Sequence, residues 1–520
     1  MRKTVTVNIG GILLGGDFPV RIQSMANTHT SDITACVEQC KRIADAGADY
    51  VRFTVPSVAE ADAFGKIKEI LRNDGYSTPL IADVHFNPDI ALRVAEYADK
   101  VRINPGNFTS KDKFIQLIEK CRSLGKAIRI GVNHGSLSQS IMDKYGDTPE
   151  GMAESAMEYL RICRDLNFHQ VVVSMKSSNV RVMVYANRLV ADMMDKEGMH
   201  YPLHLGVTEA GEGEDGRIKS AVGIGTLLSE GTGDTVRVSL TEAPEAEVPV
   251  AERIVRWSRA GGNDGSRKIG RYEYIRRESR RVGNIGGGQV PVVYGFDRLN
   301  EIIKPIRASE RSLDDELLAL LTTDKDTALV YTVSEYDIPE ELKRLRKLLE
   351  LKNCDVPVIF RMACDDYSEE DFIIRTAVAL GGAFIDGFGD GIWLENNNQL
   401  TPERVISTAL GILQACRARM SKTEFIACPS CGRTNFDLME TLARIKKATG
   451  HLKGLKIGVM GCIVNGPGEM ADADYGYVGS GMGKVTLYKA KEIVKKGIPE
   501  NRAVEELIAL IKANGDWLDE

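Results

Sequence analysis

The sequence predicts an α/β protein with three parts: an N-terminal eight-stranded barrel, a central βα domain and a C-terminal α+β domain. Over residues 18–245, eight short β-rich runs alternate with helical patterns. A second and shorter βα series follows a stretch rich in Gly and Arg, and the last hundred residues place cysteines in loops. A chain of 520 residues is expected to hold two to four domains, at about 100–200 residues per domain.

Residues 1–257 are expected to form the barrel. The strand-like runs are residues 19–25, 50–55, 79–86, 100–106, 127–135, 170–178, 203–211 and 235–241. Helical patterns such as residues 32–48 and 151–166 lie between them. Eight βα repeats within about 240 residues match the strand count and size of a TIM (β/α)8 barrel.

Residues 258–289 are expected to be a linker, because they are rich in Gly and Arg and poor in apolar side chains. The simplest interpretation of its Arg run is a solvated arm. Residues 290–415 then repeat a βα pattern, with strand-like runs at 290–296, 327–335, 356–364 and 382–395. This α/β insertion is too short for a second eight-stranded barrel and carries no set of catalytic residue types, so it is interpreted as a scaffold. The tetrapeptide Asn-Ile-Gly-Gly occurs at residues 8–11 and again at 284–287, which hints at a partial duplication.

Residues 416–520 hold three cysteines that stand apart from the other seven. Cys428 and Cys431 form a C-x-x-C, and Cys462 follows in a Gly-rich loop. The pair alone fits zinc, a redox dithiol or a cluster, but a zinc ribbon needs a second pair and a dithiol has no need of Cys462. Three thiolates without a fourth cysteine suit an iron–sulfur cluster with one iron ligated differently. Glu469 follows an Asn-Gly-Pro-Gly bend and is a candidate for that iron, although spacing alone favours a loop carboxylate in water.

Charged residues gather at the carboxyl ends of the predicted barrel strands, where TIM barrels place their chemistry. These positions hold Arg52, Asp83, His85, Arg102, Asn104, Arg129, Asn133, Lys176, Ser178, Glu209, Arg237 and Ser239. Four of the arginines interrupt apolar runs, and burying several cations is costly unless an anion compensates them. Because Arg forks match phosphate oxygens, the set predicts a bound diphosphate. Glu209 is a candidate acid/base, and His85 is a candidate proton donor that is equally well interpreted as a core histidine.

Composition excludes several broad classes. The net charge of −6 argues against a general nucleic-acid binder, so a cationic pocket here must be local. No apolar run approaches the length of a membrane helix, and the first residues lack a signal-peptide pattern, so we expect no membrane association and a cytoplasmic location. Seven scattered cysteines are expected to be buried small hydrophobes in a reducing compartment.

The motifs QSMANTHTSD, VRFTVPS, ADVHFNP, VRINPGN, IGVNHGS, GVTEAG, VRVSLT, ACPSCGRT and GCIVNGPGE resemble the 4-hydroxy-3-methylbut-2-enyl diphosphate synthase family. The resemblance covers residues 1–255 and 416–520, and the middle segment is similar to the insertion of the family's longer form. It implies an oxidoreductase of non-mevalonate isoprenoid biosynthesis. The reaction implied is the reductive opening and dehydroxylation of 2-C-methyl-D-erythritol 2,4-cyclodiphosphate, with electrons from ferredoxin or flavodoxin.

The resemblance also implies roles for individual residues. A 4Fe–4S cluster is held by Cys428, Cys431, Cys462 and Glu469, which replaces the interpretation of Glu469 as a solvated carboxylate. The barrel cations Arg52, Arg102, Arg129, Lys176 and Arg237 bind the diphosphate, with Ser239 and Asn133 beside them. Glu209 is catalytic, and it or His85 handles protons. The insertion implies that one chain supplies both halves of a site that the short form builds from two, so the protein is expected to be a monomer or a homodimer.

Two alternatives from other classes remain open on the residues alone. One is a pterin-binding type of barrel with a zinc-bound C-terminal module, which predicts zinc and no redox activity. The other is a non-catalytic iron–sulfur regulator or carrier, against which the cationic barrel mouth argues.

Overall fold

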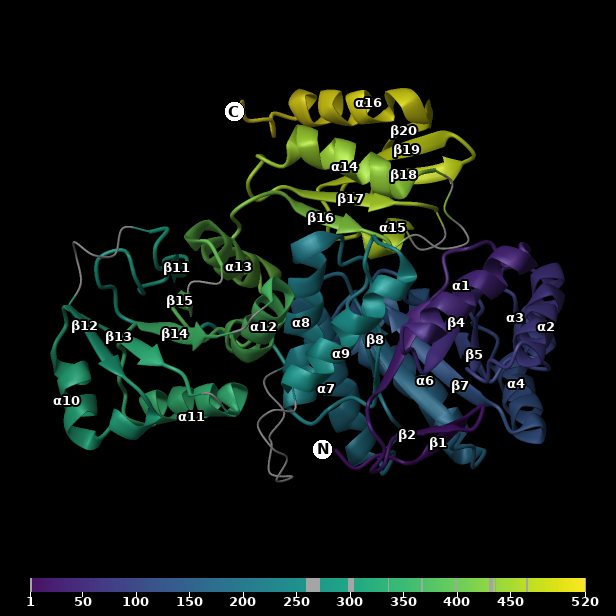
Figure 1. Cartoon of the computed structure of the whole chain (residues 1–520), viewed down its shortest axis with the longest axis horizontal. Helices are drawn as coiled ribbons and strands as arrows, with labels where there is room; N and C mark the ends of the chain where they lie inside the picture. The colour runs from purple at the N-terminus through teal and green to yellow at the C-terminus, as the bar shows by residue number, and fades with distance from the viewer. Residues whose placement is uncertain are drawn as a thin grey trace. The chain divides into compact units, whose positions relative to one another are not determined.

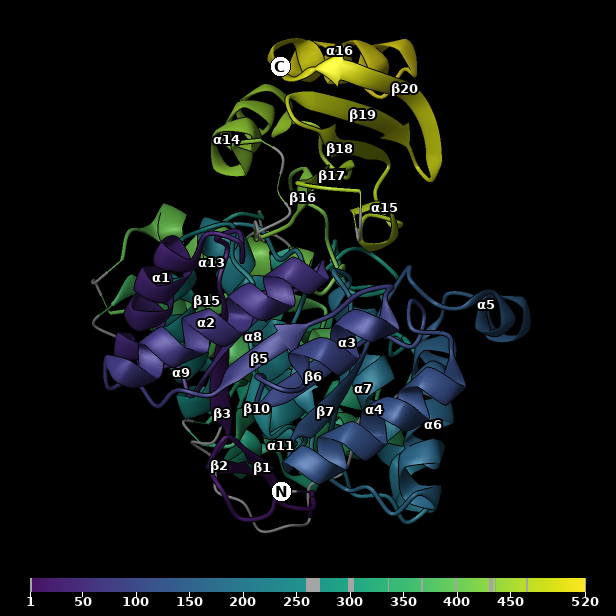
Figure 2. The same ribbon diagram turned by 90° about the vertical axis from the view of Figure 1, so that its right-hand side faces the viewer.

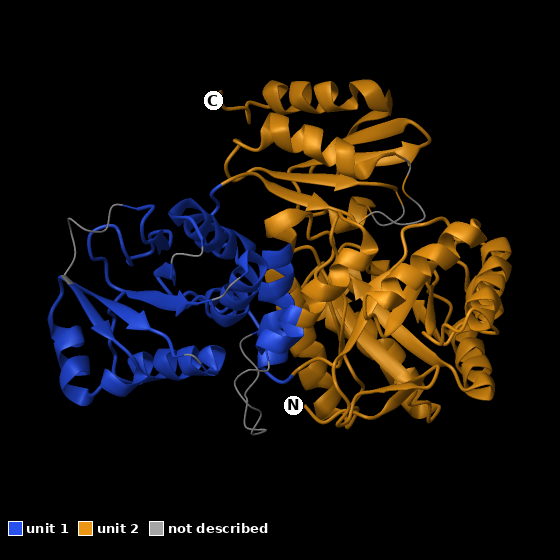
Figure 3. Cartoon of the chain, in the orientation of Figure 1, with its two compact units in different colours: residues 1, 217–231, 253–421 blue, residues 2–216, 232–252, 422–520 orange. Residues whose placement is uncertain are grey.

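The computed structural model describes residues 2–258, 272–297, 304–334, 336–365, 368–397, 400–429, 434, 436–463 and 466–519. The chain divides into two compact units (Figure 3). Unit 1 comprises residues 1, 217–231 and 253–421, and unit 2 comprises residues 2–216, 232–252 and 422–520. No helix of the described residues is both long and apolar enough to cross a membrane.

Unit 2 contains a closed parallel barrel, as the alternating pattern predicts (Figure 1). Its strands are β3 (Arg21–Met25), β4 (Tyr50–Thr54), β5 (Leu80–Asp83), β6 (Lys100–Ile103), β7 (Ala127–Asn133), β8 (Val171–Lys176), β9 (His204–Leu205) and β10 (Thr235–Val236). The spatial order is β8-β7-β6-β5-β4-β3-β10-β9, and a parallel bridge between Val173 and Leu203 closes the circle. All eight expected strands are present, although the last two are much shorter than their apolar runs.

Helices follow the barrel strands along the chain, and those that lie within unit 2 cover the outside of the barrel. They are α1 (Ile33–Asp45), α2 (Val58–Asn73), α3 (Pro88–Val94), α4 (Lys111–Leu124), α5 (Gln139–Tyr145), α6 (Pro149–Asp165), α7 (Val180–Lys196), α8 (Gly213–Ser229) and α9 (Glu247–Ser258), the last preceded by the turn η1 (Pro244–Ala246). Several begin at a polar cap, for example at Asp32 and Ser57, whose side chains accept from the first-turn backbone amides of Ala35 and Glu60. The seven scattered cysteines are all buried, which confirms their interpretation as small hydrophobes.

A hairpin closes the amino-terminal end of the barrel. Its strands β1 (Val7–Ile9) and β2 (Ile12–Leu14) pack Ile9 and Leu14 into a core with Tyr50 and Ile81. Because this end is filled by apolar side chains, the open end of the barrel is the one at the carboxyl ends of the strands.

The C-terminal part of unit 2 is a five-stranded mixed sheet with helices (Figure 2). Its strands are β16 (Glu424–Ala427), β17 (Lys456–Met460), β18 (Tyr475–Gly481), β19 (Lys484–Lys489) and β20 (Glu492–Pro499), and its helices are α14 (Leu438–Thr449), α15 (Gly466–Glu469) and α16 (Glu500–Ala513). The first three strands are parallel, so the loops after β16 and β17 meet at one edge of the sheet. These are the loops that carry the cysteines.

Unit 1 holds the central parallel sheet, in the order β11-β15-β14-β13-β12. Its elements are β11 (Val292–Val293), β12 (Lys304–Ala308), β13 (Thr327–Thr332), β14 (Val358–Cys364), β15 (Gly391–Asn396), the turn η2 (Glu310–Ser312), α10 (Asp315–Thr323), α11 (Ile338–Leu351), α12 (Glu369–Ile385) and α13 (Pro402–Ala415).

Three features of this unit differ from the expectations. Strand β12 was not expected, because its Pro and two cations weaken the β signal. Residues 382–385 end helix α12 rather than begin a strand, since a buried helix is as apolar as a strand.

The third difference concerns the Arg-rich stretch, whose described part is residues 272–289. A solvated arm was expected, but Arg277 is only 9% exposed and donates through Nη1 to the Val356 carbonyl at 3.0 Å. Arg280 donates to Asp355 at 2.6 Å. These arginines therefore attach the stretch to the central domain. The repeated tetrapeptide has a matching structural role: Ile9 is fully buried in the core beneath the barrel strands, and Ile285 is fully buried in a core of the central sheet.

Candidate active site at the barrel mouth

A cavity of about 80 Å³ lies between the carboxyl ends of the barrel strands and the cysteine loops of unit 2. The expected residues that line it are Arg52, Asp83, Arg102, Arg129, Asn133, Lys176, Glu209, Arg237, Ser239, Cys428, Cys462 and Glu469. His85, Asn104 and Ser178 do not line the cavity but hydrogen-bond within or beside the same network. Cys431 lies outside the described residues.

The cations of the mouth are deeply buried and incompletely paired. Arg129 is 1% exposed, and its Nε and Nη1 have no hydrogen-bond partner within the described ranges. Lys176 Nζ and Ser239 Oγ are likewise buried without a hydrogen-bond partner among the described residues. The pKa values of Arg129 and Lys176 are lowered well below their ordinary values, mainly by burial and to a smaller extent by repulsion from neighbouring arginines. Donors in this state call for an anion, so the cavity is built for a ligand with several negative oxygens.

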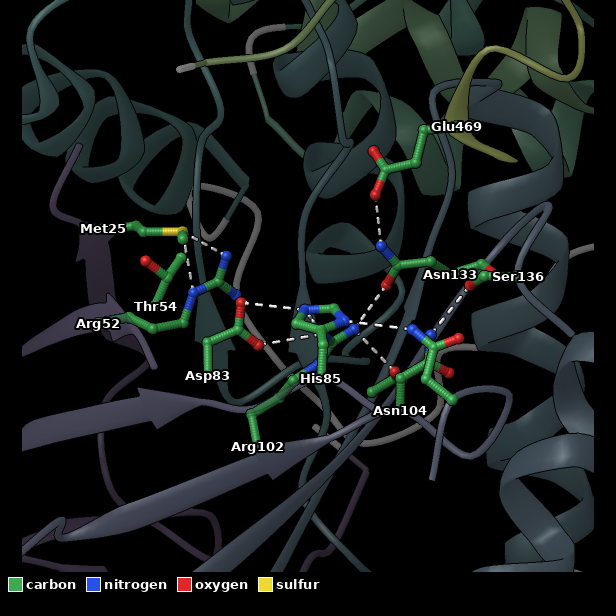
Figure 4. Close-up of polar contacts among 12 residues, drawn as sticks. Met25, Arg52, Thr54, Asp83, His85, Arg102, Asn104, Asn133, Ser136 and Glu469 are labelled. Atoms are coloured by element: carbon green, nitrogen blue, oxygen red, sulfur yellow. Dashed lines mark hydrogen bonds and ion pairs between the residues drawn. The ribbon is translucent and has the colours of Figure 1, made fainter. Parts of the chain in front are cut away.

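Arg102 is the centre of a polar network at the mouth (Figure 4). Its Nη1 lies 3.0 Å from Asp83 Oδ1 and 2.9 Å from His85 Nε2, and its Nη2 donates to Asn133 Oδ1 at 2.8 Å. Burial raises the pKa of Asp83, but the charges of Arg102 and Arg52 outweigh it and hold that pKa well below the usual range. His85 Nε2 lies 2.9 Å from Arg102 Nη1, which only donates, and 3.4 Å from Asp83 Oδ2, which accepts. The network thus holds His85 between Arg102 and Asp83, and its role as donor or acceptor depends on which ring nitrogen carries the proton.

Two further residues of the mouth are anchored from the side. Arg52 donates to the sulfur of Met25, with Nε 3.0 Å from Sδ. Asn104 donates from Nδ2 to Ser136 Oγ at 2.9 Å, which holds the loop after β6 against the loop after β7. Both contacts leave the expected residues in fixed positions around the cavity.

Glu469 joins the cysteine loops to the barrel. Its Oε1 accepts from Asn133 Nδ2 at 2.5 Å, and its carbonyl accepts from Ser178 Oγ at 3.0 Å. The backbones approach closely at the same place: a Cβ built on Gly135 would lie 2.0 Å from the carbonyl oxygen of Gly468. Gly135 also has a φ of +78°, so glycine is required there by both contact and conformation.

Glu209 is buried beside Glu469. Burial, reinforced by the neighbouring Glu469 carboxyl, raises the pKa of Glu209 well above its ordinary value. Its backbone φ is +49°, a strained conformation for a residue with a side chain. Phe86, which follows His85, has a φ of +64°. Glu209 and Phe86 adjoin the mouth, while five other described non-glycine residues with positive φ lie elsewhere, so the strain accompanies the site without defining it.

The cysteine loops supply candidate metal ligands to the same cavity. Cys428 follows β16, and its sulfur accepts from the amide of Gly461 at 3.2 Å. Cys428 and Cys462 are partly exposed and none of the described cysteines forms a disulfide. One oxygen of Glu469, Oε2, is buried without a partner among the described residues. No group of three possible metal ligands occurs within the described residues, which do not include Cys431. Two thiols and an unsatisfied carboxylate oxygen on one cavity fit the ligand types of an iron–sulfur cluster with one oxygen ligand.

The sequence did not reveal Glu247 as part of the site. This residue is 2% exposed at the start of α9, where Oε1 lies 3.3 Å from Arg237 Nη2 and Oε2 accepts from Ser24 Oγ at 2.8 Å. Its position after the last barrel strand gave no signal, because an acidic residue in the first turn of a helix is common. The structure makes it the counter-ion of one mouth arginine.

Comparisons with known proteins agree with this arrangement. Residues 4–252 match the model of the GcpE TIM-barrel domain, and residues 424–513 match the model of the GcpE protein C-terminal domain. A 4-hydroxy-3-methylbut-2-en-1-yl diphosphate synthase (flavodoxin) of Bacteroides fragilis is 45% identical, over 99% of this chain and 96% of the relative. The Porphyromonas gingivalis protein of the same name is 46% identical, over 99% and 98%. A chloroplastic relative of rice, named for ferredoxin, is 38% identical over 100% of this chain and 88% of its own.

Proposed function

The chain belongs to the family of 4-hydroxy-3-methylbut-2-en-1-yl diphosphate synthases, and we propose that unit 2 carries out that synthesis at the barrel mouth. The substrate proposed is 2-C-methyl-D-erythritol 2,4-cyclodiphosphate. Its ring is opened and one hydroxyl is lost as water, with uptake of two electrons and of protons, to give the allylic diphosphate. The observation that carries this proposal is the set of buried cations with unpartnered donors, facing the cavity that Cys428, Cys462 and Glu469 also line.

The diphosphate is bound by the mouth cations. Arg129 and Lys176 offer buried donors without other partners among the described residues, and Ser239 adds a hydroxyl. Arg52, Arg102 and Arg237 complete the cationic surface, each held by a neighbouring side chain. Because these groups are already in place, binding orients the substrate and offsets its charge without reorganising the site.

The ligands proposed for a 4Fe–4S cluster are Cys428, Cys431, Cys462 and Glu469. When bound, the cluster supplies single electrons and a Lewis-acidic iron for breaking the C–O bond. Asn133 holds one oxygen of Glu469, and Arg102 holds Asn133 in turn. A movement of Arg102 on binding substrate would therefore shift the carboxylate of Glu469 through the side-chain amide of Asn133.

Glu209 is proposed as the group that holds a proton beside the reacting atoms. It is buried, it lines the cavity, and its carboxyl lies beside that of Glu469. His85 is the second candidate for handling protons, since its Nε2 lies 3.4 Å from Asp83 Oδ2 and 2.9 Å from Arg102 Nη1. Electrons come from an electron-carrier protein of the flavodoxin or ferredoxin type, as the names of the relatives indicate.

One chain is proposed to supply both halves of this site, since the barrel and the cysteine loops belong to the same compact unit. This supports a catalytically complete monomer, with the central domain as a scaffold that carries no reacting group. Cytoplasmic location is proposed with it, in keeping with reduced and buried cysteines.

The test is metal analysis and turnover of protein purified without oxygen. We expect about four irons and four acid-labile sulfides per chain, an EPR signal after reduction, and conversion of the cyclodiphosphate by a protein with the mass of one chain. One zinc without sulfide would overturn the cluster assignment. Iron and sulfide without turnover would restrict the chain to electron carrying.

Glu247→Gln is expected to raise the KM for the cyclodiphosphate about tenfold, because a hydrogen bond to a charged group contributes about 1.5–3 kcal/mol. The substitution keeps the shape of the side chain but removes the counter-ion of Arg237. Turnover at saturating substrate should change little, since Glu247 touches Arg237 and not the reacting atoms. The matched control is Glu252→Gln, an exposed glutamate on the same helix α9. An unchanged KM would show that Arg237 is positioned without Glu247.

A further inference from the structure

The edge of the C-terminal sheet that carries the cysteines also carries an exposed hairpin tip. Strand β18 runs parallel to β17, with Val478 opposite Met460, so the residues after both strands leave the sheet at one edge. Cys462 and Ile463 follow β17, and Met482 follows β18 in the turn to β19. The two backbones are close there, because a Cβ built on Gly479 would lie 2.4 Å from the Gly461 carbonyl oxygen.

This tip presents apolar side chains to solvent. Met482 is 93% exposed, the highest value for any large apolar residue within the described ranges. Ile463, directly after the proposed ligand Cys462, is 56% exposed. Gly481 and Gly483 flank Met482 with φ values of +140° and +63°, so the turn is tight and holds Met482 outward. Folding does not require an apolar side chain at such a position.

The hairpin behind the tip is basic, although the whole chain is acidic. Between residues 484 and 499 it contains five lysines (Lys484, Lys489, Lys491, Lys495 and Lys496) and a single acidic residue, Glu492, against a net charge of −6 for the protein. All five lysines are exposed, and Lys484 stands two residues from Met482. Lys484 is the lysine at the tip, whereas Lys489 and Lys491 lie at the opposite turn of the hairpin. A small apolar surface beside an exposed cation is suited to a transient interface with an acidic protein.

We propose that Ile463, Met482 and Lys484 form the docking surface for an acidic electron-carrier protein of the flavodoxin type. The inference rests on the proposed function, since it assumes that Cys462 holds the cluster. The catalytic cavity is lined by barrel and loop residues together and is far too small for a protein, so electrons must enter from outside it. The tip offers such an entry because its apolar residues adjoin the Cys462 loop and are open to solvent.

The test is the double variant Met482→Glu/Lys484→Glu in the anaerobic holoenzyme. Its matched control is Val494→Glu/Lys496→Glu, the same types of change on β20, the outermost strand of the same sheet, away from the turn that carries Met482. Two quantities are measured for each protein: the Kd for a flavodoxin by biolayer interferometry, at low and high salt, and turnover driven by reduced flavodoxin or by reduced methyl viologen.

In the tip variant, we expect the Kd to rise at least tenfold, the salt dependence of binding to weaken, and flavodoxin-driven turnover to fall at least tenfold. Viologen-driven turnover should stay within twofold, and the control should match the unaltered enzyme. An unchanged Kd in the tip variant, an equal loss in the control, or no measurable flavodoxin binding by the unaltered enzyme would each overturn the proposal. Failure of the proposed function is distinguishable, because it would abolish viologen-driven turnover in every variant.

Discussion

Cys462→Ser is expected to abolish the cluster and turnover while leaving the fold intact. The thiolate is the ligand that iron–sulfur chemistry requires, and a serine hydroxyl is a poor substitute. Cys462 lies in a partly exposed loop after β17, so its loss creates no core cavity. Iron and sulfide per chain should fall to a small fraction of the unaltered value. Turnover should drop by about a hundredfold or more, since a metal centre contributes several kcal/mol to such a reaction.

The matched control for Cys462→Ser is Cys163→Ala in helix α6. Burial raises the pKa of the Cys163 thiol far above its ordinary value, so it stays protonated and has no ligand character. We expect full iron content and turnover in this control, with some loss of stability from the small cavity. A Cys462→Ser protein with unaltered iron, sulfide and turnover would contradict the proposed ligand set.

Arg129→Met is expected to lower kcat/KM by about 30-fold or more, because removing one member of a buried charge pair costs about 2–5 kcal/mol. Arg129 sits on β7 with two guanidinium nitrogens aimed at no partner among the described residues, which leaves them for the diphosphate. Kinetics with the cyclodiphosphate and calorimetric binding measure the loss.

The same substitution should raise the Tm of the ligand-free enzyme. Arg129 is a buried cation surrounded by Arg52, Arg102 and Arg237, so without a bound anion it destabilises the fold. Arg129→Lys provides the control, since it keeps the charge and loses the fork, and it should fall between the unaltered enzyme and the Met variant. A Met variant with lower Tm and normal kcat/KM would assign Arg129 to structure alone.

Much of the fold follows from local pattern. Alternating β runs and helical patterns predicted all eight barrel strands in order, because each strand is apolar on the buried side and each helix follows within a few residues. The arginines at the strand ends were recognisable for the same reason, since a charge within an apolar run stands out. The alternating pattern was weaker in the central domain. Pro305 lowered the β signal of β12, and the apolar, buried end of α12 was predicted as part of a strand.

The sequence by itself singled out most of the candidate residues: the mouth cations and Glu209 by their positions at strand ends, the cysteines by their spacing, and Glu469 by the resemblance to the family. Only the tertiary structure decided how they are paired. Glu247 faces Arg237, and His85 lies between Arg102 and Asp83. Arg102 donates to Asn133, which donates in turn to Glu469, 336 residues further along the chain than Asn133. Such pairings depend on distances between segments far apart in sequence. A periodic pattern indicates which side of a helix or strand is buried. It does not indicate which side chain of another element packs against that side.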